Sequence, residues 1–133
     1  MSENESPFGE VIYAYTRAQA IADGVLHDVT TTAKEAGIVL PTVVTDSVWG
    51  RCVSVPESLR GQQDEEGRLW DVVYMASHYL REAKRSGVHS DQLTYEVLVR
   101  DGDGLTRLVS IIAHVGPGDE GEPVLTLMFP EDN

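Results

Sequence analysis

The feature that most constrains the fold is a change in the spacing of apolar residues after the middle of the chain. Over residues 69–83 apolar side chains recur at steps of three and four, which places them on one face of an α-helix. Trp70 and Tyr74 widen that face. Arg85 suits the negative end of the helix dipole, and Gly87 can end the helix. We therefore predict one long helix that is largely covered.

After this helix apolar and polar residues alternate, which is typical of β-strands. The alternation runs over residues 93–100 and leads into the turn residues 101–104. Two further strands are expected over residues 105–115 and 124–129, with a glycine-rich turn between them. The predicted fold is α+β: N-terminal short helices and one long amphipathic helix packed on a C-terminal three-stranded antiparallel meander.

The N-terminal half predicts short helices that begin and end at recognisable residues. Thr16 and Gln19 have the spacing of a capping box, so a helix is expected over residues 17–23. A second short helix is expected to begin at Thr30 and to stop at Gly37.

The length and composition of the chain fit one domain. It has 133 residues, of which 41% are hydrophobic, and this is enough for one core. We expect an acidic flexible leader at residues 1–9 and a single α+β domain at residues 10–133. The apolar runs are short, so neither a membrane span nor a membrane partner is expected. A single cysteine, Cys52, and an acidic start without a signal peptide favour the cytoplasm.

No pattern typical of a catalytic or cofactor site is present. Gly116, Gly118 and Gly121 have the spacing of a dinucleotide-binding loop, but a strand is predicted where such a site requires a helix. The four histidines lack metal-ligand spacing, and Cys52 lies in no thiol-enzyme motif. We expect no catalytic residues, no cofactor and no metal, and the sequence favours a protein that is not an enzyme without deciding the question.

The charge is strongly negative. There are 22 acidic and 10 basic residues, giving −12, which disfavours direct nucleic-acid binding because that requires a surplus of Lys and Arg. After Arg107 the chain has five acidic residues and no Lys or Arg, and a second acidic cluster precedes the long helix. These carboxylates either imitate the charge of a DNA duplex toward a protein partner or only keep the chain soluble. The predicted partner-binding residues are Asp119, Glu120, Glu122, Glu131, Asp132, Asp64, Glu65 and Glu66.

Several stretches spread over nearly the whole chain resemble one family. They include YTRAQAIADGVL at 15–26, PTVVT at 41–45, GRLWDV at 67–72 and LMFPED at 127–132. They resemble a family of small proteins of unknown function that are encoded by bacterial phages, plasmids and other mobile elements. The resemblance implies an accessory gene of mobile DNA, and such genes often encode inhibitors of host defence.

These observations lead to three hypotheses. We expect a non-enzymatic acidic accessory protein that inhibits a host nucleic-acid-binding defence system by protein–protein interaction. The first alternative is a small-molecule-binding or enzymatic domain with a pocket between the long helix and the sheet, lined by Trp70, Tyr74, His78 and Tyr95. The second is a homodimer with a structural or regulatory role, because both faces of the central predicted strand are apolar.

Overall fold

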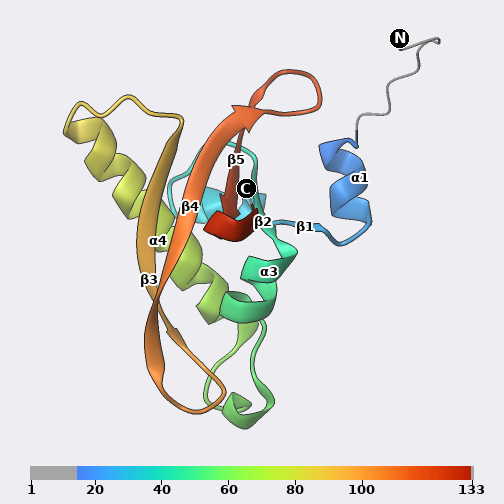
Figure 1. The fold of residues 1–133 in the computed structure, drawn as a ribbon, viewed down its shortest axis with the longest axis vertical. Coiled ribbons are helices and arrows are strands. Elements are labelled where there is room, and N and C mark those ends of the chain that lie inside the picture. The colour runs from blue at the N-terminus through green and yellow to red at the C-terminus, as the bar shows by residue number, and fades with distance from the viewer. Residues whose placement is uncertain (1–14, 133) are drawn as a thin grey trace.

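The computed structural model describes residues 15–132, which form a five-stranded sheet with a long helix along one face (Figure 1). The helices are α1 (Arg17–Ala22), α2 (Thr30–Glu35), α3 (Asp46–Val48) and α4 (Glu65–Arg85). The strands are β1 (Leu26–Asp28), β2 (Thr42–Thr45), β3 (Gln92–Arg100), β4 (Thr106–Pro117) and β5 (Pro123–Met128). A π-helical turn η1 (Trp49–Val53) and two 3-10 turns, η2 (Glu57–Leu59) and η3 (Pro130–Asp132), complete the fold. The predicted leader, residues 1–9, lies outside the described residues.

The sheet corrects the predicted architecture. The fold is α+β, but the three-stranded antiparallel meander is wrong, because the sheet has five strands in the order β1-β2-β5-β4-β3. β2 pairs with β5 in parallel, and the other neighbours are antiparallel. The three predicted strands are present as β3, β4 and β5, and β1 and β2 extend the sheet beyond β5.

There is a physical reason why the sequence does not predict β2. Thr42, Val43 and Val44 are all fully buried, so successive side chains are covered on both faces of the sheet and no alternation appears in the sequence. Such a short apolar run after Pro41 carries no periodicity that separates a strand from a connecting segment.

The α1 and α4 helices begin after residues whose side chains satisfy N–H groups of the first turn. Thr16 Oγ1 accepts a hydrogen bond from Gln19 N–H, and Gln19 Oε1 accepts one from Thr16 N–H, both at 3.0 Å, so the predicted capping box is confirmed. The predicted long helix is also confirmed, and it begins after Asp64, whose Oδ1 accepts from Gly67 N–H at 2.7 Å. Within the described residues, none of the helices has both the length and the apolar composition needed to cross a bilayer.

The main core lies between α4 and the sheet. Val72, Val73 and Ala76 of α4 are buried in one cluster with Tyr95 and Ile111 of the sheet. The Tyr95 hydroxyl donates to the Val72 carbonyl at 3.0 Å, so the polar atom of this buried side chain is satisfied. Burial of each of these valine or isoleucine side chains stabilises the fold by about 1.5–3 kcal/mol relative to leaving it exposed.

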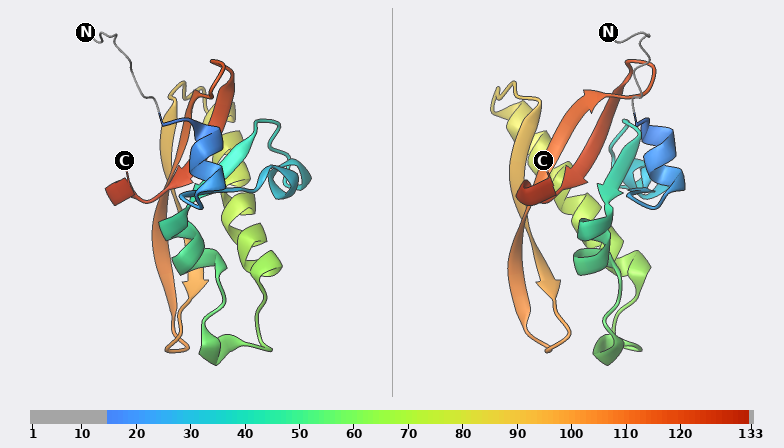
Figure 2. Two further views of the ribbon diagram at one scale, coloured as in Figure 1. Left: turned by 90° about the vertical axis from the view of Figure 1, so that its right-hand side faces the viewer. Right: turned by 45° about the vertical axis from the view of Figure 1, so that its right-hand side comes forward.

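The two ends of the sheet are covered differently. Figure 2 shows α1 beside the β1–β2 end, with the long β3–β4 hairpin at the other end. Val43, Ile112 and Val124 are buried without belonging to the core under α4, whereas Leu98 and Leu108 on the β3–β4 hairpin are exposed. The β3–β4 end therefore offers the more open surface.

Candidate functional site

β3 is one of the two edge strands of the sheet in the described residues, and with nine residues it is longer than the other edge strand, β1, which has three. Backbone bonds at both ends of the β3–β4 pair show which residues face the β3 edge. At one end the Asp91 carbonyl accepts from Val115 N–H at 2.7 Å, and at the other Asp101 N–H donates to the Leu105 carbonyl at 2.9 Å. One continuous antiparallel register joins these two pairs.

Three β3 residues present their backbone to the open edge. Bonded and non-bonded pairs alternate along an antiparallel ladder, so odd-numbered β3 residues bond β4 and the residues between them point outward. The outward-facing carbonyls at the two ends of β3 already accept hydrogen bonds from the chain itself. Ser90 Oγ donates to the Gln92 carbonyl at 2.8 Å, and Arg68 donates to the Arg100 carbonyl at 2.9 Å. The outward-facing residues between them are Thr94, Glu96 and Leu98.

Two exposed leucines lie on the outer face of the sheet beside this edge. Leu98 of β3 and Leu108 of β4 are direct partners in the register, with exposed fractions of 63% and 59%. Facing side chains on neighbouring strands are close enough to pack together. We refer to Leu98 and Leu108 as the leucine pair.

A groove of about 430 Å³ runs between α4 and the β3 edge. Tyr74, Met75 and Tyr79 line it from the helix. Residues of the β3–β4 hairpin, including the leucine pair, line it from the sheet. We refer to this hollow as the edge groove. Its walls are mainly apolar and aromatic, which is the lining typical of binding surfaces.

The edge groove has an acidic rim. Asp71 of α4 and Glu96 of β3 both line it, and both are exposed. Partial desolvation of its carboxyl group raises the pKa of Asp71, although the nearby guanidinium of Arg68 acts in the opposite direction. Two carboxylates beside an apolar hollow favour a ligand that combines apolar groups with positive charge.

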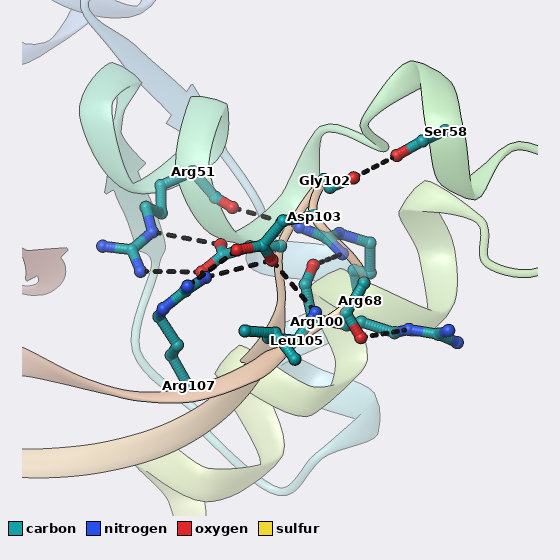
Figure 3. A network of polar contacts seen from close by, with 10 residues as sticks. Arg51, Ser58, Arg68, Arg100, Gly102, Asp103, Leu105 and Arg107 are labelled. Atoms are coloured by element: carbon teal, nitrogen blue, oxygen red, sulfur yellow. Dashed lines mark hydrogen bonds and ion pairs between the residues drawn. The ribbon is translucent and has the colours of Figure 1, made fainter.

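A buried arginine holds the lower end of this site (Figure 3). Arg68 is only 5% exposed, and its guanidinium donates to Gln63 Oε1 at 2.6 Å, the Arg100 carbonyl at 2.9 Å and the Arg51 carbonyl at 3.0 Å. These three acceptors come from the segment before α4, from β3 and from η1. Arg68 therefore ties three parts of the chain together where β3 ends.

A second arginine fixes the β3–β4 turn (Figure 3). Arg107 pairs with Asp101 at 2.8 Å and with Asp103 at 2.7 Å, and Arg51 of η1 reaches Asp101 at 3.2 Å. Hydrogen bonds from Arg107 and from Leu105 N–H lower the pKa of Asp103 to about 2. The sequence predicts a turn at residues 101–104 but not this network, because only the Asp-Gly-Asp-Gly stretch and Arg107 signal it.

The aromatic residues predicted to line a pocket are only partly brought together. Tyr74 lines the edge groove, and Trp70 stacks on it with ring centroids 5.7 Å apart. His78 is exposed and meets Tyr79 edge-on at 5.8 Å. Tyr95 instead lies in the core, 1% exposed.

The predicted acidic residues occupy three separate places. Residues 119–122 lie in the β4–β5 turn, at the top of Figure 1, and residues 131 and 132 lie in η3. Residues 64–66 lie at the start of α4, in the lower part of the figure. Strand pairing and helix packing thus separate groups that the charge count alone had combined.

Half of these carboxylates hold backbone or hydroxyl groups of the chain itself. Asp119 accepts from Arg17 N–H at 2.7 Å and Ala18 N–H at 3.0 Å, and so caps α1. Asp132 accepts from Thr45 Oγ1, Ser47 Oγ and Phe129 N–H. Burial tends to raise the pKa of Asp132, but these hydrogen bonds outweigh it and lower the pKa.

Of the other six predicted acidic residues, two bond groups within the chain and four are exposed. Glu122 accepts from Glu120 N–H at 3.0 Å, and Asp64 is the N-cap of α4. The side chains of Glu65, Glu66, Glu120 and Glu131 are exposed.

Neither the Cys52 thiol nor any group of possible metal ligands forms a second candidate site in the described residues. Cys52 is buried, and burial raises the pKa of its thiol to about 11. In residues 15–132 no three His, Cys, Asp or Glu side chains form a group that could hold a metal ion.

Comparison with known proteins identifies a family and nothing closer. No curated protein and no solved structure matches the chain. A model of a family of unknown function, DUF6573, matches residues 4–133. This match covers nearly the entire chain, including α4, the β3 edge and the turn that Arg107 fixes. The chain therefore belongs to the DUF6573 family.

Proposed function

We propose that this protein binds a partner protein at the open β3 edge of its sheet. The observation that carries the proposal is the leucine pair, in which two facing apolar side chains are each more than half exposed beside a groove with aromatic walls. Contiguous apolar patches with a polar rim are typical of protein–protein contacts, whereas single exposed leucines are ordinary surface features.

Capture from a bacterial lysate with matched variants tests this function. The immobilised protein is expected to retain a partner that the double variant Leu98→Asn, Leu108→Asn does not retain. The control is Val39→Asn, which removes an apolar side chain that is 85% exposed in the connection between α2 and β2. Equal retention by the wild type and the leucine variant would show that the function is assigned to the wrong surface.

We also propose that the partner is a nucleic-acid-binding defence protein of a bacterial host, and that the gene is carried by a mobile element. The support is the −12 charge, since a strongly acidic protein attracts the basic surfaces with which other proteins bind phosphate backbones. The family resemblance to proteins of phages and plasmids supports the same context.

Neutralising selected carboxylates tests this second proposal. Glu120→Gln with Glu131→Gln is expected to weaken partner retention and to flatten its dependence on salt. Asp119 and Asp132 are left unchanged, because both hold the fold through internal hydrogen bonds. If retention is insensitive to both the variant and the salt concentration, the electrostatic mechanism is wrong.

A further inference from the structure

We propose that the edge groove takes an extended segment of a partner protein, which adds to β3 as a further strand and places a basic side chain beside Glu96 and Asp71. This proposal rests on the proposed function above and specifies its mode of binding and the chemistry of the partner. Strand addition supplies affinity through main-chain hydrogen bonds and specificity through alternate side chains.

The backbone of β3 sets the length of this segment. Along the open edge of β3, Ser90 already bonds the Gln92 carbonyl at one end, and Arg68 bonds the Arg100 carbonyl at the other. Between them Thr94, Glu96 and Leu98 direct N–H and C=O groups to the edge, and no side chain of the described residues bonds those groups. An added strand of about five residues would pair with this stretch.

The surfaces on either side of the edge set the side-chain pattern. Successive side chains of a strand point to opposite faces. One set would lie on the α4 side of the edge, against Tyr74, Met75 and Tyr79, and the other would lie on the outer side, beside the leucine pair. Both environments favour apolar contact, so the segment is expected to carry apolar residues at alternate positions at least.

The charges around the edge select the occupant. Asp71 and Glu96 line the groove, and the whole chain carries −12. A second copy of the chain would bring the same net charge and the same two carboxylates to the contact, which is unfavourable. A basic segment of another protein meets complementary charge instead.

Synthetic peptides test this proposal directly with the full chain. The probe is a fluorescein-labelled seven-residue peptide with valine at every second position and lysine between, followed by fluorescence anisotropy at low salt. The same peptide with glutamate in place of lysine tests the charge. A lysine peptide N-methylated along one backbone edge tests whether backbone hydrogen bonds hold it.

Thr94 offers a matched pair of protein variants. Its N–H points away from β4, so Thr94→Pro removes an edge donor and keeps the β3–β4 ladder, whereas Thr94→Val keeps the donor. The lysine peptide is expected to bind Thr94→Pro at least about fivefold more weakly than the wild type and Thr94→Val equally well. Circular dichroism checks that both variants fold, and the N-methylated peptide gives an independent reading if the proline variant does not.

The charge variants complete the test. Glu96→Gln with Asp71→Asn is expected to weaken binding of the lysine peptide about threefold and to reduce its salt dependence. Strand addition is wrong if the lysine peptide fails to bind, binds Thr94→Pro unchanged, or binds no better than the glutamate peptide. It is also wrong if light scattering detects a dimer that Thr94→Pro dissociates, since a second copy then occupies the edge. Partner capture that depends on the leucine pair would survive any failure of the peptides.

Discussion

Among single residues, Arg68 is a buried charged side chain that joins three segments of the chain by hydrogen bonds. Its guanidinium is buried, and within the described residues no carboxylate lies at ion-pair distance, so all of its hydrogen bonds go to neutral acceptors. Two of those acceptors are backbone carbonyls of η1 and β3, which no other described side chain bonds.

Replacing Arg68 is therefore expected to destabilise the fold. Arg68→Met leaves the Arg51 and Arg100 carbonyls without their donor and should lower the free energy of unfolding by about 2 kcal/mol. Urea denaturation measures this. The control Arg60→Met removes an exposed arginine whose pair with Glu57, at 3.5 Å, should contribute less than about 1 kcal/mol. Equal losses in the two variants would contradict the role assigned to Arg68.

Asp103 gives a pH dependence of defined sign. Hydrogen bonds from Arg107 and Leu105 N–H lower its folded-state pKa to about 2, below its ordinary unfolded value. The ionised carboxylate therefore stabilises the fold fully above pH ~4, and this contribution is lost as the pH falls toward 2. The thermal midpoint of Asp103→Asn should lie below that of the wild type at pH 7, and the difference should shrink at pH 2. A difference that is constant with pH would show that the carboxylate charge does not contribute.

Among the elements, α1 depends on a residue far from it in the sequence. Asp119 in the β4–β5 turn accepts hydrogen bonds from two N–H groups in the first turn of α1, in addition to the local Thr16 cap. A short helix has little stability of its own, so this distant cap links its formation to the folded sheet.

The variant Asp119→Ala tests that link. It should cost about 1 kcal/mol of unfolding free energy and speed hydrogen exchange at the α1 amides. Glu120→Ala, next to it on the same turn, is the control and should leave α1 exchange unchanged, since the Glu120 side chain makes no contact with α1 among the described hydrogen bonds. Unchanged exchange in the Asp119 variant would mean that α1 is held by other contacts.

The sequence predicted the elements with strong periodicity and missed those without it. The α4 pattern and the alternation along β3 are long enough to identify each element, and the predicted bounds differ from the observed ones by a few residues. β2 is only four residues long and completes its hydrogen bonds with a strand more than 70 residues later, which no local pattern encodes. The architecture was therefore wrong where it depended on a non-local pairing.

The site was predictable to a smaller extent. A hollow between the long helix and the sheet was one hypothesis, and Tyr74 does line the edge groove. The sequence places Tyr95 in the same pocket, whereas the structure buries it in the core. The alternation along a strand shows that the strand has two faces, but it does not show which of them α4 covers. The role of Arg68 could not be foreseen, since burial of a charged side chain depends on acceptors from three distant segments.

For the whole molecule, Cys52 provides a reporter of global unfolding. It lies in the core cluster with residues of α4 and the sheet, and its thiol pKa of about 11 leaves roughly 0.1% thiolate at pH 8. A disulfide reagent such as dithionitrobenzoate should react with the native protein only as fast as the protein unfolds. Labelling of Cys52 much faster than unfolding followed by circular dichroism would show that the region around η1 opens separately.

The parallel β2–β5 pair has a consequence during synthesis. On the ribosome β1 and β2 emerge well before the strand that completes their sheet, Pro123–Met128, which is translated more than 70 residues later. Until then the apolar residues of β2 lack their covering strand, and a nascent chain that stalls before β5 would present them to chaperones or proteases. Production of the native fold should therefore depend on translation continuing through β5, and C-terminally shortened chains lacking this strand should be degraded rather than accumulate as partly folded protein.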